Sequence, residues 1–333
     1  MSRTRKIRVL FRAAAGSRGG YGHLVRCGVL ARAMGVPREI VLRGSAETGR
    51  VARRLGWALV RDAEGALVGD PPDLIVVDDP SAAQAVRWVR RARRHNIPVA
   101  TIHDLGLTRV PSDLQIDGSL TRIPGSTPAE LQGPEFAILD PSIPEMRARK
   151  PPRDPHRVLI TLGGGAHVRM AGATLARRIS SVIPNAQIVL AAGFEPFQRQ
   201  PLPPRCRWIV APAGMADALA TAAVAVVAGG LTLYEACALG TPIVAMPVVP
   251  AQRFTIRAAA AAGAAIDASA STPAQTLTRA ADGVVRLLTR PGEAARQGAR
   301  ASRLVDGEGA ARVARHLEAL AASSLRRERR HVA

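Results

Sequence analysis

Short apolar runs alternate along the chain with longer segments in which apolar residues recur at helical spacing. Runs rich in Val, Ile and Leu are expected strands, and the segments of about 10–15 residues between them are expected helices. Such alternation is typical of a parallel, doubly wound sheet. In the first half, the expected strands cover 7–11, 40–42, 73–79, 98–102 and short extended pieces at 114–116 and 136–139, and the expected helices cover 23–34, 46–55 and 82–95.

The same alternation begins again after 147–154, a charged, proline-containing segment that we interpret as a linker. A chain of 333 residues is long enough for two domains. The sequence therefore predicts two Rossmann-like domains, at 1–148 and 155–323, followed by a frayed basic tail at 324–333. The second half has expected strands at 158–162, 187–191 and 208–210, and expected helices from Met170 and at 215–221, 258–263, 275–288, 293–302 and 309–322.

The most informative stretch is 225–252, which reads AVVAGGLTLYEACALGTPIVAMPVVPAQ. It predicts a strand, a glycine turn at Gly229-Gly230, a helix that carries Glu235, and a second strand at 243–246. A glycine turn at a helix N-terminus offers backbone N–H groups to a diphosphate without a Cβ in the way. Glu235 is then placed to accept hydrogen bonds from a sugar hydroxyl. The alternative is a tight turn followed by a solvated glutamate.

The first half opens with a similar junction, the glycine-rich loop 16–22. Gly19, Gly20 and Gly22 suit positive φ, and His23 begins the helix that follows. The helix dipole is expected to favour a neutral imidazole, which can act as a general base. Ligands collect at the carboxyl ends of parallel strands, where His23 is expected. A histidine that only caps its own helix is the alternative. In the second half, 163–165 is the equivalent glycine run.

The net charge of +20 raises the question of nucleic-acid binding. Nearly all of this charge is arginine, since Lys6 and Lys150 are the only lysines, and aromatic residues make up only 3%. Few side chains can therefore stack on bases, so nucleic acid is not the expected partner. The arginine clusters at 90–94 and 326–330 are either solvated faces or weak contacts to an anionic membrane.

Cysteine content and hydropathy point to an ordinary globular protein. Cys27, Cys206 and Cys237 have no metal or redox spacing, and Cys27 and Cys237 lie in apolar helical contexts. No apolar run reaches the ~18 residues of a membrane span. We expect a cytoplasmic protein, or one peripheral at the inner face of the membrane, without a cofactor or a bound metal.

These motifs resemble the GT-B nucleotide-sugar enzymes. The residues concerned are Gly22-His23 with Arg26, the turn Gly163-Gly164, and 228–244 followed by Gln252, in matching order across both halves. The chain is most similar to the UDP-sugar hydrolases of pseudaminic acid biosynthesis, which include the SpsG-like proteins of spore-coat polysaccharide. It is more distantly similar to the peptidoglycan N-acetylglucosaminyltransferase.

The resemblance implies a GT-B fold of two Rossmann-like domains that face each other across a cleft. By position, Gly229, Gly230 and Glu235 would hold the diphosphate and ribose. The chain departs from the hydrolase pattern at Ala14, Gly165-Ala166, Ala251 and Asp140, positions that surround the sugar rather than the nucleotide. Also by position, Gly163 and Gly164 would lie against the phosphates, Met215 beside the base, Gly22 and Gln252 near the sugar, and His23 opposite the anomeric carbon.

The function expected from these residues is a metal-independent glycosyltransferase that uses a UDP-sugar and an unknown acceptor. A UDP-sugar hydrolase of the pseudaminic acid type, which releases UDP, is one alternative. A non-catalytic, cationic nucleotide or nucleic-acid binder is another. Asp78-Asp79 would either shape the acceptor or sugar pocket or cap a strand. His103-Asp104 would either help His23 or cap a strand. His167 would either touch phosphate or have no such role.

Overall fold

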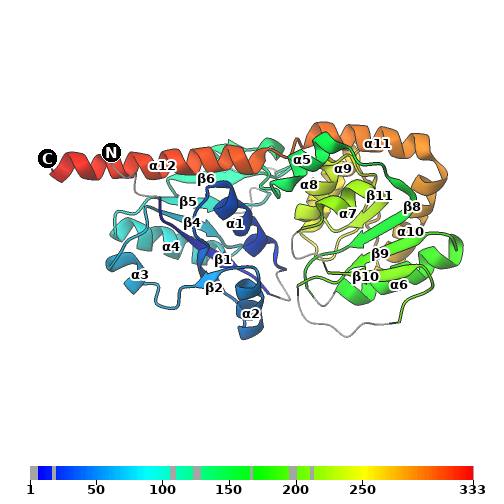
Figure 1. Ribbon diagram of the computed structural model, residues 1–333, viewed down its shortest axis with the longest axis horizontal. Helices are drawn as coiled ribbons and strands as arrows, with labels where there is room; N and C mark the ends of the chain where they lie inside the picture. Colours follow the sequence, from blue (N-terminus) through cyan, green and yellow to red (C-terminus); the bar gives the residue numbers. More distant parts are fainter. Residues whose placement is uncertain are drawn as a thin grey trace. The chain divides into compact units, whose positions relative to one another are not determined.

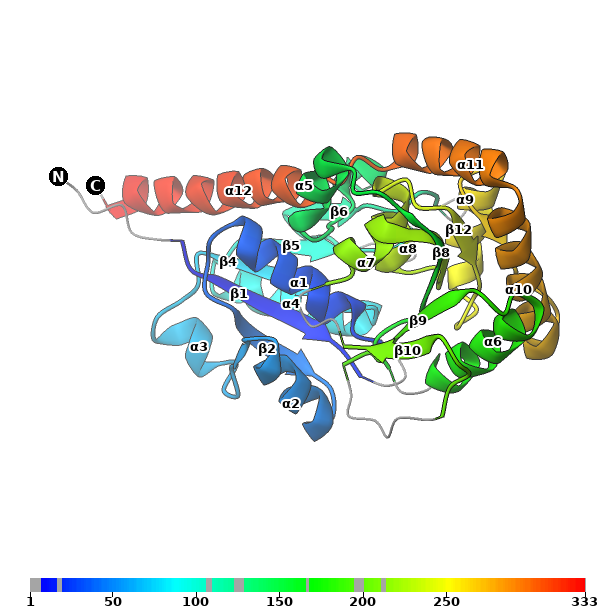
Figure 2. The ribbon, with the colours of Figure 1, turned by 45° about the vertical axis from the view of Figure 1, so that its right-hand side comes forward.

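The computed structural model describes residues 7–16, 20–105, 110–122, 129–165, 168–194, 201–210 and 214–332. Its chain forms two compact units. Unit 1 is built from Met1–Ile138 together with Glu308–Ala333, and unit 2 from Leu139–Gly307. Figures 1 and 2 show one α/β sheet in each unit.

Unit 1 contains a seven-stranded sheet in the order β3-β2-β1-β4-β5-β6-β7. All of its pairings are parallel. The strand order reverses its direction between β1 and β4, which makes this the topological switch point of the sheet. The elements of unit 1 are β1 (Val9–Ala14), α1 (Gly22–Ala33), β2 (Glu39–Arg43), α2 (Ala46–Arg54), β3 (Ala58–Leu59), α3 (Gly65–Val68), β4 (Leu74–Asp78), α4 (Ala82–Arg94), β5 (Val99–Ile102), β6 (Leu114–Asp117), β7 (Leu131–Gln132), the 3-10 helix η1 (Pro134–Phe136) and α12 (Gly309–Val332).

Helices cover both faces of this sheet, so its central strands β1, β4 and β5 are buried along their whole length and are mostly apolar. Ile75 and Val77 of β4 face a core that includes α3 and α4. Helix α4 buries Ala85, Trp88 and Ala92 in this core, at the spacing of one helical face. Helices α1 and α12 also contact β4 but contribute no residue to this core, so they lie on the opposite face of the sheet.

Unit 2 contains a six-stranded parallel sheet in the order β10-β9-β8-β11-β12-β13. Its switch point lies between β8 and β11. Figure 2 shows α6 and α10 on one face of the sheet and α7 and α8 on the other. The elements of unit 2 are α5 (Ser142–Arg149), β8 (Asp154–Thr161), α6 (Arg169–Val182), β9 (Gln187–Ala191), β10 (Cys206–Ile209), α7 (Ala216–Thr221), β11 (Ala222–Val227), α8 (Leu231–Ala238), β12 (Ile243–Ala245), α9 (Gln252–Ala261), β13 (Ile266–Asp267), α10 (Pro273–Thr289) and α11 (Pro291–Leu304).

The structure differs from the sequence prediction mainly where the chain passes between the units. The predicted division puts 142–148 in the first domain and 309–323 in the second, whereas α5 packs with unit 2 and α12 with unit 1. The expected linker 147–154 contains the end of α5, the segment 150–153 without regular secondary structure, and the first residue of β8. The expected frayed tail is helical backbone to Val332, and the expected extended piece at 136–139 follows the 3-10 helix η1.

Candidate functional site

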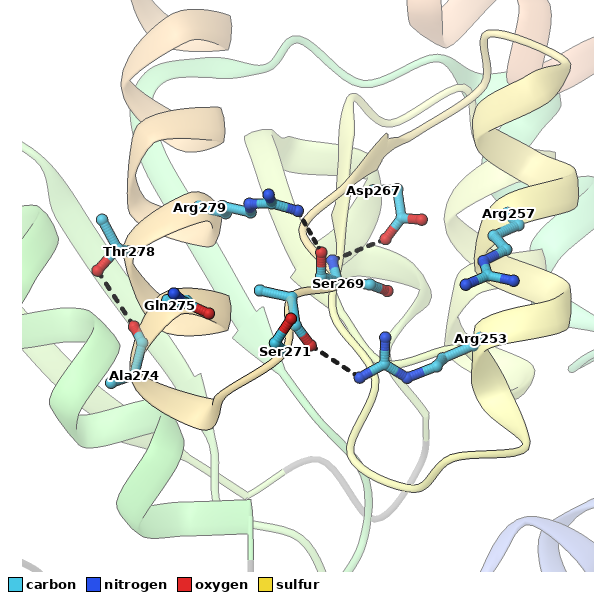
Figure 3. Close-up of a pocket in the computed structure, with 10 residues that line it drawn as sticks. Arg253, Arg257, Asp267, Ser269, Ser271, Ala274, Gln275, Thr278 and Arg279 are labelled. Atoms are coloured by element: carbon cyan, nitrogen blue, oxygen red, sulfur yellow. Dashed lines mark hydrogen bonds between the residues drawn. The ribbon is translucent and has the colours of Figure 1, made fainter.

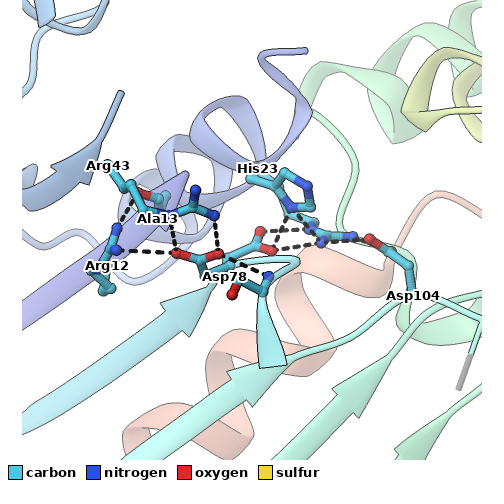
Figure 4. Close-up of polar contacts among 9 residues, drawn as sticks. Arg12, Ala13, His23, Arg43, Asp78 and Asp104 are labelled. Atoms are coloured by element: carbon cyan, nitrogen blue, oxygen red, sulfur yellow. Dashed lines mark hydrogen bonds and ion pairs between the residues drawn. The ribbon is translucent and has the colours of Figure 1, made fainter. Parts of the chain in front are cut away.

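Four polar side chains of unit 1 form a hydrogen-bonded cluster at the carboxyl edge of its sheet. His23 and Arg26 lie in the first turns of α1, Asp78 ends β4, and Asp104 follows β5. Since β1, β4 and β5 are neighbours in the sheet, the loops that follow them meet at one edge. His23 contacts Asp78, and Arg26 contacts both Asp78 and Asp104. Figure 4 labels His23, Asp78 and Asp104 in this cluster.

His23 contacts Asp78 directly, with 2.7 Å between Nδ1 and Oδ1. An ionised carboxylate only accepts hydrogen bonds, so Nδ1 of His23 carries the proton and donates it to Asp78. In the neutral ring, Nε2 then carries the lone pair. No described residue forms a hydrogen bond with this second nitrogen, and the His23 side chain is 17% exposed. The pair therefore presents a proton acceptor whose ring is held in one orientation.

Arg26 holds the two acids in place. Its Nε and Nη2 donate to the two oxygens of Asp78, each at 2.7 Å. Its Nη1 donates to Asp104 Oδ1, also at 2.7 Å. Burial alone would lower the pKa of Arg26, but Asp104 and Asp78 outweigh it and raise this pKa well above the usual value. Arg26 therefore stays charged and orients Asp78 toward His23.

The electrostatics of His23 correct one sequence-based expectation. Burial lowers the pKa of His23, but the charge of Asp78 and its hydrogen bond outweigh burial, so this pKa is raised. The expected depression by the helix dipole is wrong, because an ion pair at 2.7 Å exceeds a dipole that is worth about 0.3–1 kcal/mol. Burial would likewise raise the pKa of Asp78, but Arg26 and His23 hold it well below its usual range.

The neighbouring acid, Asp79, has a structural role. Its side chain is fully buried and pairs with Arg12 at 3.1 Å and Arg43 at 2.5 Å. It also accepts the backbone N–H of Ser81 at 2.9 Å. Burial would raise the pKa of Asp79, but these hydrogen bonds and charges lower it. Asp79 thus fixes the loop after β4, next to the acid that contacts His23.

His103 takes no part in the cluster through hydrogen bonds. Its Nε2 lies 2.7 Å from the Thr101 hydroxyl, which in turn contacts the Ser112 hydroxyl at 2.6 Å. Burial lowers the pKa of His103, so the ring is neutral at pH 7. The sequence pointed to both His103 and Asp104 as possible helpers of His23. Only Asp104 joins the cluster, and it does so through a hydrogen bond with Arg26 rather than with His23.

In unit 2, two glycine turns lie side by side at the switch point of the sheet. Gly163-Gly164 follows β8 and Gly229-Gly230 follows β11, and these two strands are paired. The structure thus brings together both glycine motifs that the sequence singled out. Gly163 has φ +123, a conformation that favours glycine, and a Cβ on it would meet nothing within 4 Å. Gly230 is the N-cap of α8.

The two glycines before α8 differ in what surrounds them. A Cβ on Gly229 would lie 2.8 Å from the Cβ and the carbonyl oxygen of Gln252, so this glycine allows α9 to pack against the turn. A Cβ on Gly230 would meet only the Gln252 amide nitrogen, at 3.9 Å. Gly230 thus leaves an open approach to the N-terminus of α8, whereas the absence of a side chain at Gly229 is explained by packing.

Glu235 and Gln252 flank this turn. Glu235 is partly exposed, yet burial of its carboxyl group and the nearby charge of Asp140 raise its pKa to about 7. Gln252 begins α9, and its Oε1 accepts the backbone N–H of Val248 at 2.9 Å. That bond fixes the side chain, so the Gln252 amide group is left as a donor. Met215 is the N-cap of α7.

The two groups of predicted site residues lie in different units. His23 and Gly22 belong to unit 1 and begin α1, while Gly163, Gly164, Met215, Gly229, Gly230, Glu235 and Gln252 belong to unit 2. His167 lies outside the described residues. Sequence reasoning missed Asp78 as the partner of His23, although the acids at the end of the expected strand 73–79 were the available signal.

Comparison with solved structures identifies the fold. The chain is similar to the spinosyn rhamnosyltransferase SpnG in complex with thymidine diphosphate, at 18% identity and a TM-score of 0.65, with 94% of this chain and all of that chain covered. It is similar to MurG of Acinetobacter baumannii, at 15% identity and a TM-score of 0.62, with 93% and 99% covered. It is also similar to the glycosyltransferase SnogD of Streptomyces nogalater, at 19% identity and a TM-score of 0.57, with 95% and 100% covered.

The fold is GT-B. This result confirms the fold class predicted from the sequence, and at these identities it shows the fold alone. No family profile matches the chain, and no curated protein matches it either. Among the described residues, no helix combines the length and the hydropathy of a transmembrane segment. Within the GT-B fold, the glycine turns of unit 2 and the histidine cluster of unit 1 each occupy the switch point of their own sheet.

Proposed function

We propose that the chain is a glycosyltransferase that takes a sugar from a UDP-sugar and transfers it to an acceptor hydroxyl. The observation that carries this proposal is the His23–Asp78 pair, whose Nδ1–Oδ1 distance is 2.7 Å. Histidine held in this way by a carboxylate is an effective general base, because the carboxylate stabilises the imidazolium that forms. The presence of glycosyltransferases among the solved GT-B neighbours supports the same reaction class.

In the proposed reaction, Nε2 of His23 takes the proton of the acceptor hydroxyl as its oxygen attacks the anomeric carbon. The bond between that carbon and the diphosphate oxygen breaks, and UDP leaves with the electron pair. Asp78 stabilises the imidazolium. Arg26 and Asp104 position Asp78 and do not touch the substrate.

Unit 2 is assigned the nucleotide. Backbone N–H groups at Gly163-Gly164 and at Gly229-Gly230 would face the diphosphate, where they stabilise developing negative charge. Glu235 would accept hydrogen bonds from the ribose, and Met215 would lie beside the base. Gln252 and Gly22 are assigned to the sugar. No step is routed through a metal ion, since no DxD-like motif follows a strand of the second half.

The test is incubation with a panel of UDP-, dTDP- and GDP-sugars, with and without candidate acceptors, followed by measurement of nucleoside diphosphate release. We expect acceptor-dependent release from a UDP-sugar. His23→Ala is expected to reduce turnover by about 10²–10⁴-fold, with unchanged UDP affinity. His156→Ala, which removes an exposed histidine of β8, is the matched control.

Each other outcome has a definite meaning. Rapid release without any acceptor would replace transfer by hydrolysis, which the resemblance also allows. Unchanged turnover in His23→Ala would overturn the assignment of the base. UDP binding with no turnover of any donor would favour a nucleotide-binding protein over an enzyme.

A further inference from the structure

A polar cavity in unit 2 contains none of the residues assigned to the nucleotide sugar. It has a volume of about 740 Å³ and lies between α9, α10 and the loop that follows β13. Strand β13 is separated from β11 by β12, so β13 lies about 10 Å along the sheet from the strand that leads into Gly230. The arginine cavity, as we call it, is therefore distinct from the glycine turns.

Three guanidinium groups line the arginine cavity from two sides. Arg253 and Arg257 are one turn apart on α9, and Arg279 projects from α10 (Figure 3). The only acid among the lining residues is Asp267, which accepts the backbone N–H of Ser269 at 2.7 Å. Three positive charges and one negative charge leave a net charge of +2, and within the described chain Asp267 forms no ion pair with these arginines.

Several donors of the cavity have unused hydrogen-bonding capacity. Arg253 and Arg279 each donate one hydrogen bond to a carbonyl oxygen of the loop, of Ala270 and Ser269 respectively, which holds their guanidinium groups at the cavity wall. Arg257 has no hydrogen-bond or ion-pair partner in the part of the chain that the structure describes. The hydroxyl of Ser269 is buried there without a partner. These groups are arranged to receive an anion.

The N-terminus of α10 adds to the positive potential of the cavity. Thr272 and Gln275 form a capping box there, which satisfies the N–H of Gln275. The helix nevertheless directs the positive end of its dipole at the loop that lines the cavity. The anion is thus favoured by both fixed charges and the helix.

The remaining lining residues indicate what else the ligand carries. They are Ser271, Thr278, Gln275 and two alanines, without an aromatic or large aliphatic side chain. Such a wall suits hydroxyl groups and does not suit an acyl chain or a nucleobase. A volume of about 740 Å³ also exceeds what a bare phosphate fills. We propose that the arginine cavity binds a small, hydroxylated phosphate ester of the sugar phosphate class.

The proposal is independent of the glycosyltransferase assignment and is tested by binding. Glucose 6-phosphate is titrated into the protein by calorimetry in the presence of saturating UDP, which occupies the glycine turns. We expect saturable binding of glucose 6-phosphate, and none of glucose. Arg257→Ala is expected to weaken this binding about tenfold or more, because it removes a charge-assisted contact to phosphate.

Arg296→Ala is the matched control, since Arg296 is an exposed arginine of α11 that does not line the cavity. It should bind glucose 6-phosphate as the wild type does. Both variants should keep the wild-type melting temperature, because Arg257 contacts no described residue through a polar bond. Equal affinities of the two variants, or no saturable binding by the wild type, would overturn the proposal. If UDP itself does not bind, the same comparison on the free protein still decides the question.

Two further probes test the ligand class. Inorganic phosphate should bind more weakly than glucose 6-phosphate, because it leaves the hydroxyl-lined part of the cavity unfilled. Tighter binding of inorganic phosphate would overturn the sugar part of the assignment. Vesicles that contain phosphatidic acid should not bind through Arg257. If the protein binds these vesicles, if Arg257→Ala weakens that binding, and if glucose 6-phosphate does not bind, the cavity is a site for a lipid headgroup instead.

Discussion

At the scale of single residues, the candidate base is defined by a balance of opposing effects. Burial favours the neutral form of His23, while the carboxylate of Asp78 at 2.7 Å favours the charged form and prevails. Asp78 is itself held ionised by Arg26. The proton affinity of His23 therefore depends on a side chain from another element, which can be changed without touching the ring.

We predict that Asp78→Asn lowers the pKa of His23 and weakens catalysis. The base form of His23 is the active one, so the wild-type kcat/KM falls as the pH drops through its raised pKa. Without the carboxylate, this fall moves to lower pH and the plateau decreases. A pH–rate profile measures both. Asp104→Asn is the control, because Asp104 contributes least among the causes that raise the pKa of His23. A pH–rate profile of Asp78→Asn that matches the wild-type profile would contradict the prediction.

The raised pKa of His23 also makes the stability of the fold depend on pH. A pKa that is raised in the folded state stabilises the fold fully below the unfolded value of about 6.5. That contribution is lost as the pH rises through the folded value. The difference in unfolding free energy between the wild type and His23→Gln should accordingly shrink above this pH.

Glu235 leads to a second pH-dependent prediction. Burial and Asp140 raise its pKa to about 7, so its ionised form costs stability as the pH rises from about 4.5 to above 7. Glu235→Gln should therefore raise the melting temperature at pH 8 and not at pH 4. If the carboxylate accepts ribose hydrogen bonds, wild-type UDP affinity should increase through pH 7, and Glu235→Gln should remove that increase. Calorimetry at pH 6 and pH 8 measures it.

Asp140→Asn separates the two causes of this shift. It removes the neighbouring charge, lowers the pKa of Glu235 and should move the rise in UDP affinity to lower pH. A UDP affinity independent of pH in the wild type would contradict the assigned role of Glu235.

At the scale of elements, the turn between β11 and α8 predicts opposite results for adjacent glycines. Gly229→Ala places a Cβ 2.8 Å from Gln252 and should destabilise the fold by about 1–3 kcal/mol. Gly230→Ala meets nothing closer than 3.9 Å at φ −111, so its stability should be close to that of the wild type. Its Cβ enters the approach to the helix N-terminus and should weaken UDP binding by about tenfold or more. Thermal unfolding and UDP titration of both variants measure these effects, and wild-type UDP affinity in Gly230→Ala would contradict the nucleotide assignment.

Most strands and helices could be predicted from the sequence because each carries a strong local pattern. The continuous apolar run of β4 and the apolar face of α4 are examples. The two-residue strands β3, β7 and β13 were missed, since a pair of residues has no periodicity and gains its strand geometry from a neighbouring strand. The basic segment at the C-terminus resembled a tail because its composition is polar.

The candidate site, too, could be predicted only in part from the sequence. His23 could be found because it follows a glycine-rich loop at a helix start, which is a local signal. Its contact with Asp78 had only an indirect signal, the position of an acid at a strand end, because the two residues are 55 positions apart and meet only through the pairing of β1 with β4. Strand order is a property of the assembled sheet.

At the scale of the whole molecule, the chain enters unit 2 after Ile138 and returns to unit 1 at Glu308. Helix α12 then packs on unit 1, where it contacts α1, β4 and η1. Its Val313 and Leu317 are fully buried. The second half of the sequence therefore completes the core of the first unit, and the ends of the chain belong to one folding unit.

This arrangement predicts that a cavity in α12 weakens unit 1 selectively. Leu317→Ala should lower the free energy of unfolding of unit 1 by about 2–5 kcal/mol, because Leu317 is 0% exposed. The units can be monitored separately, since Trp57 and Trp88 lie in unit 1 and Trp208 in unit 2. In a Trp208→Phe background, tryptophan fluorescence reports unit 1 alone, and Leu317→Ala should lower its urea midpoint. Leu287→Ala, a matched cavity in α10 of unit 2, should leave that midpoint unchanged. An unchanged midpoint in Leu317→Ala would show that α12 does not belong to the cooperative unit formed by residues 1–138, and equal shifts from both variants would show that the two units unfold together.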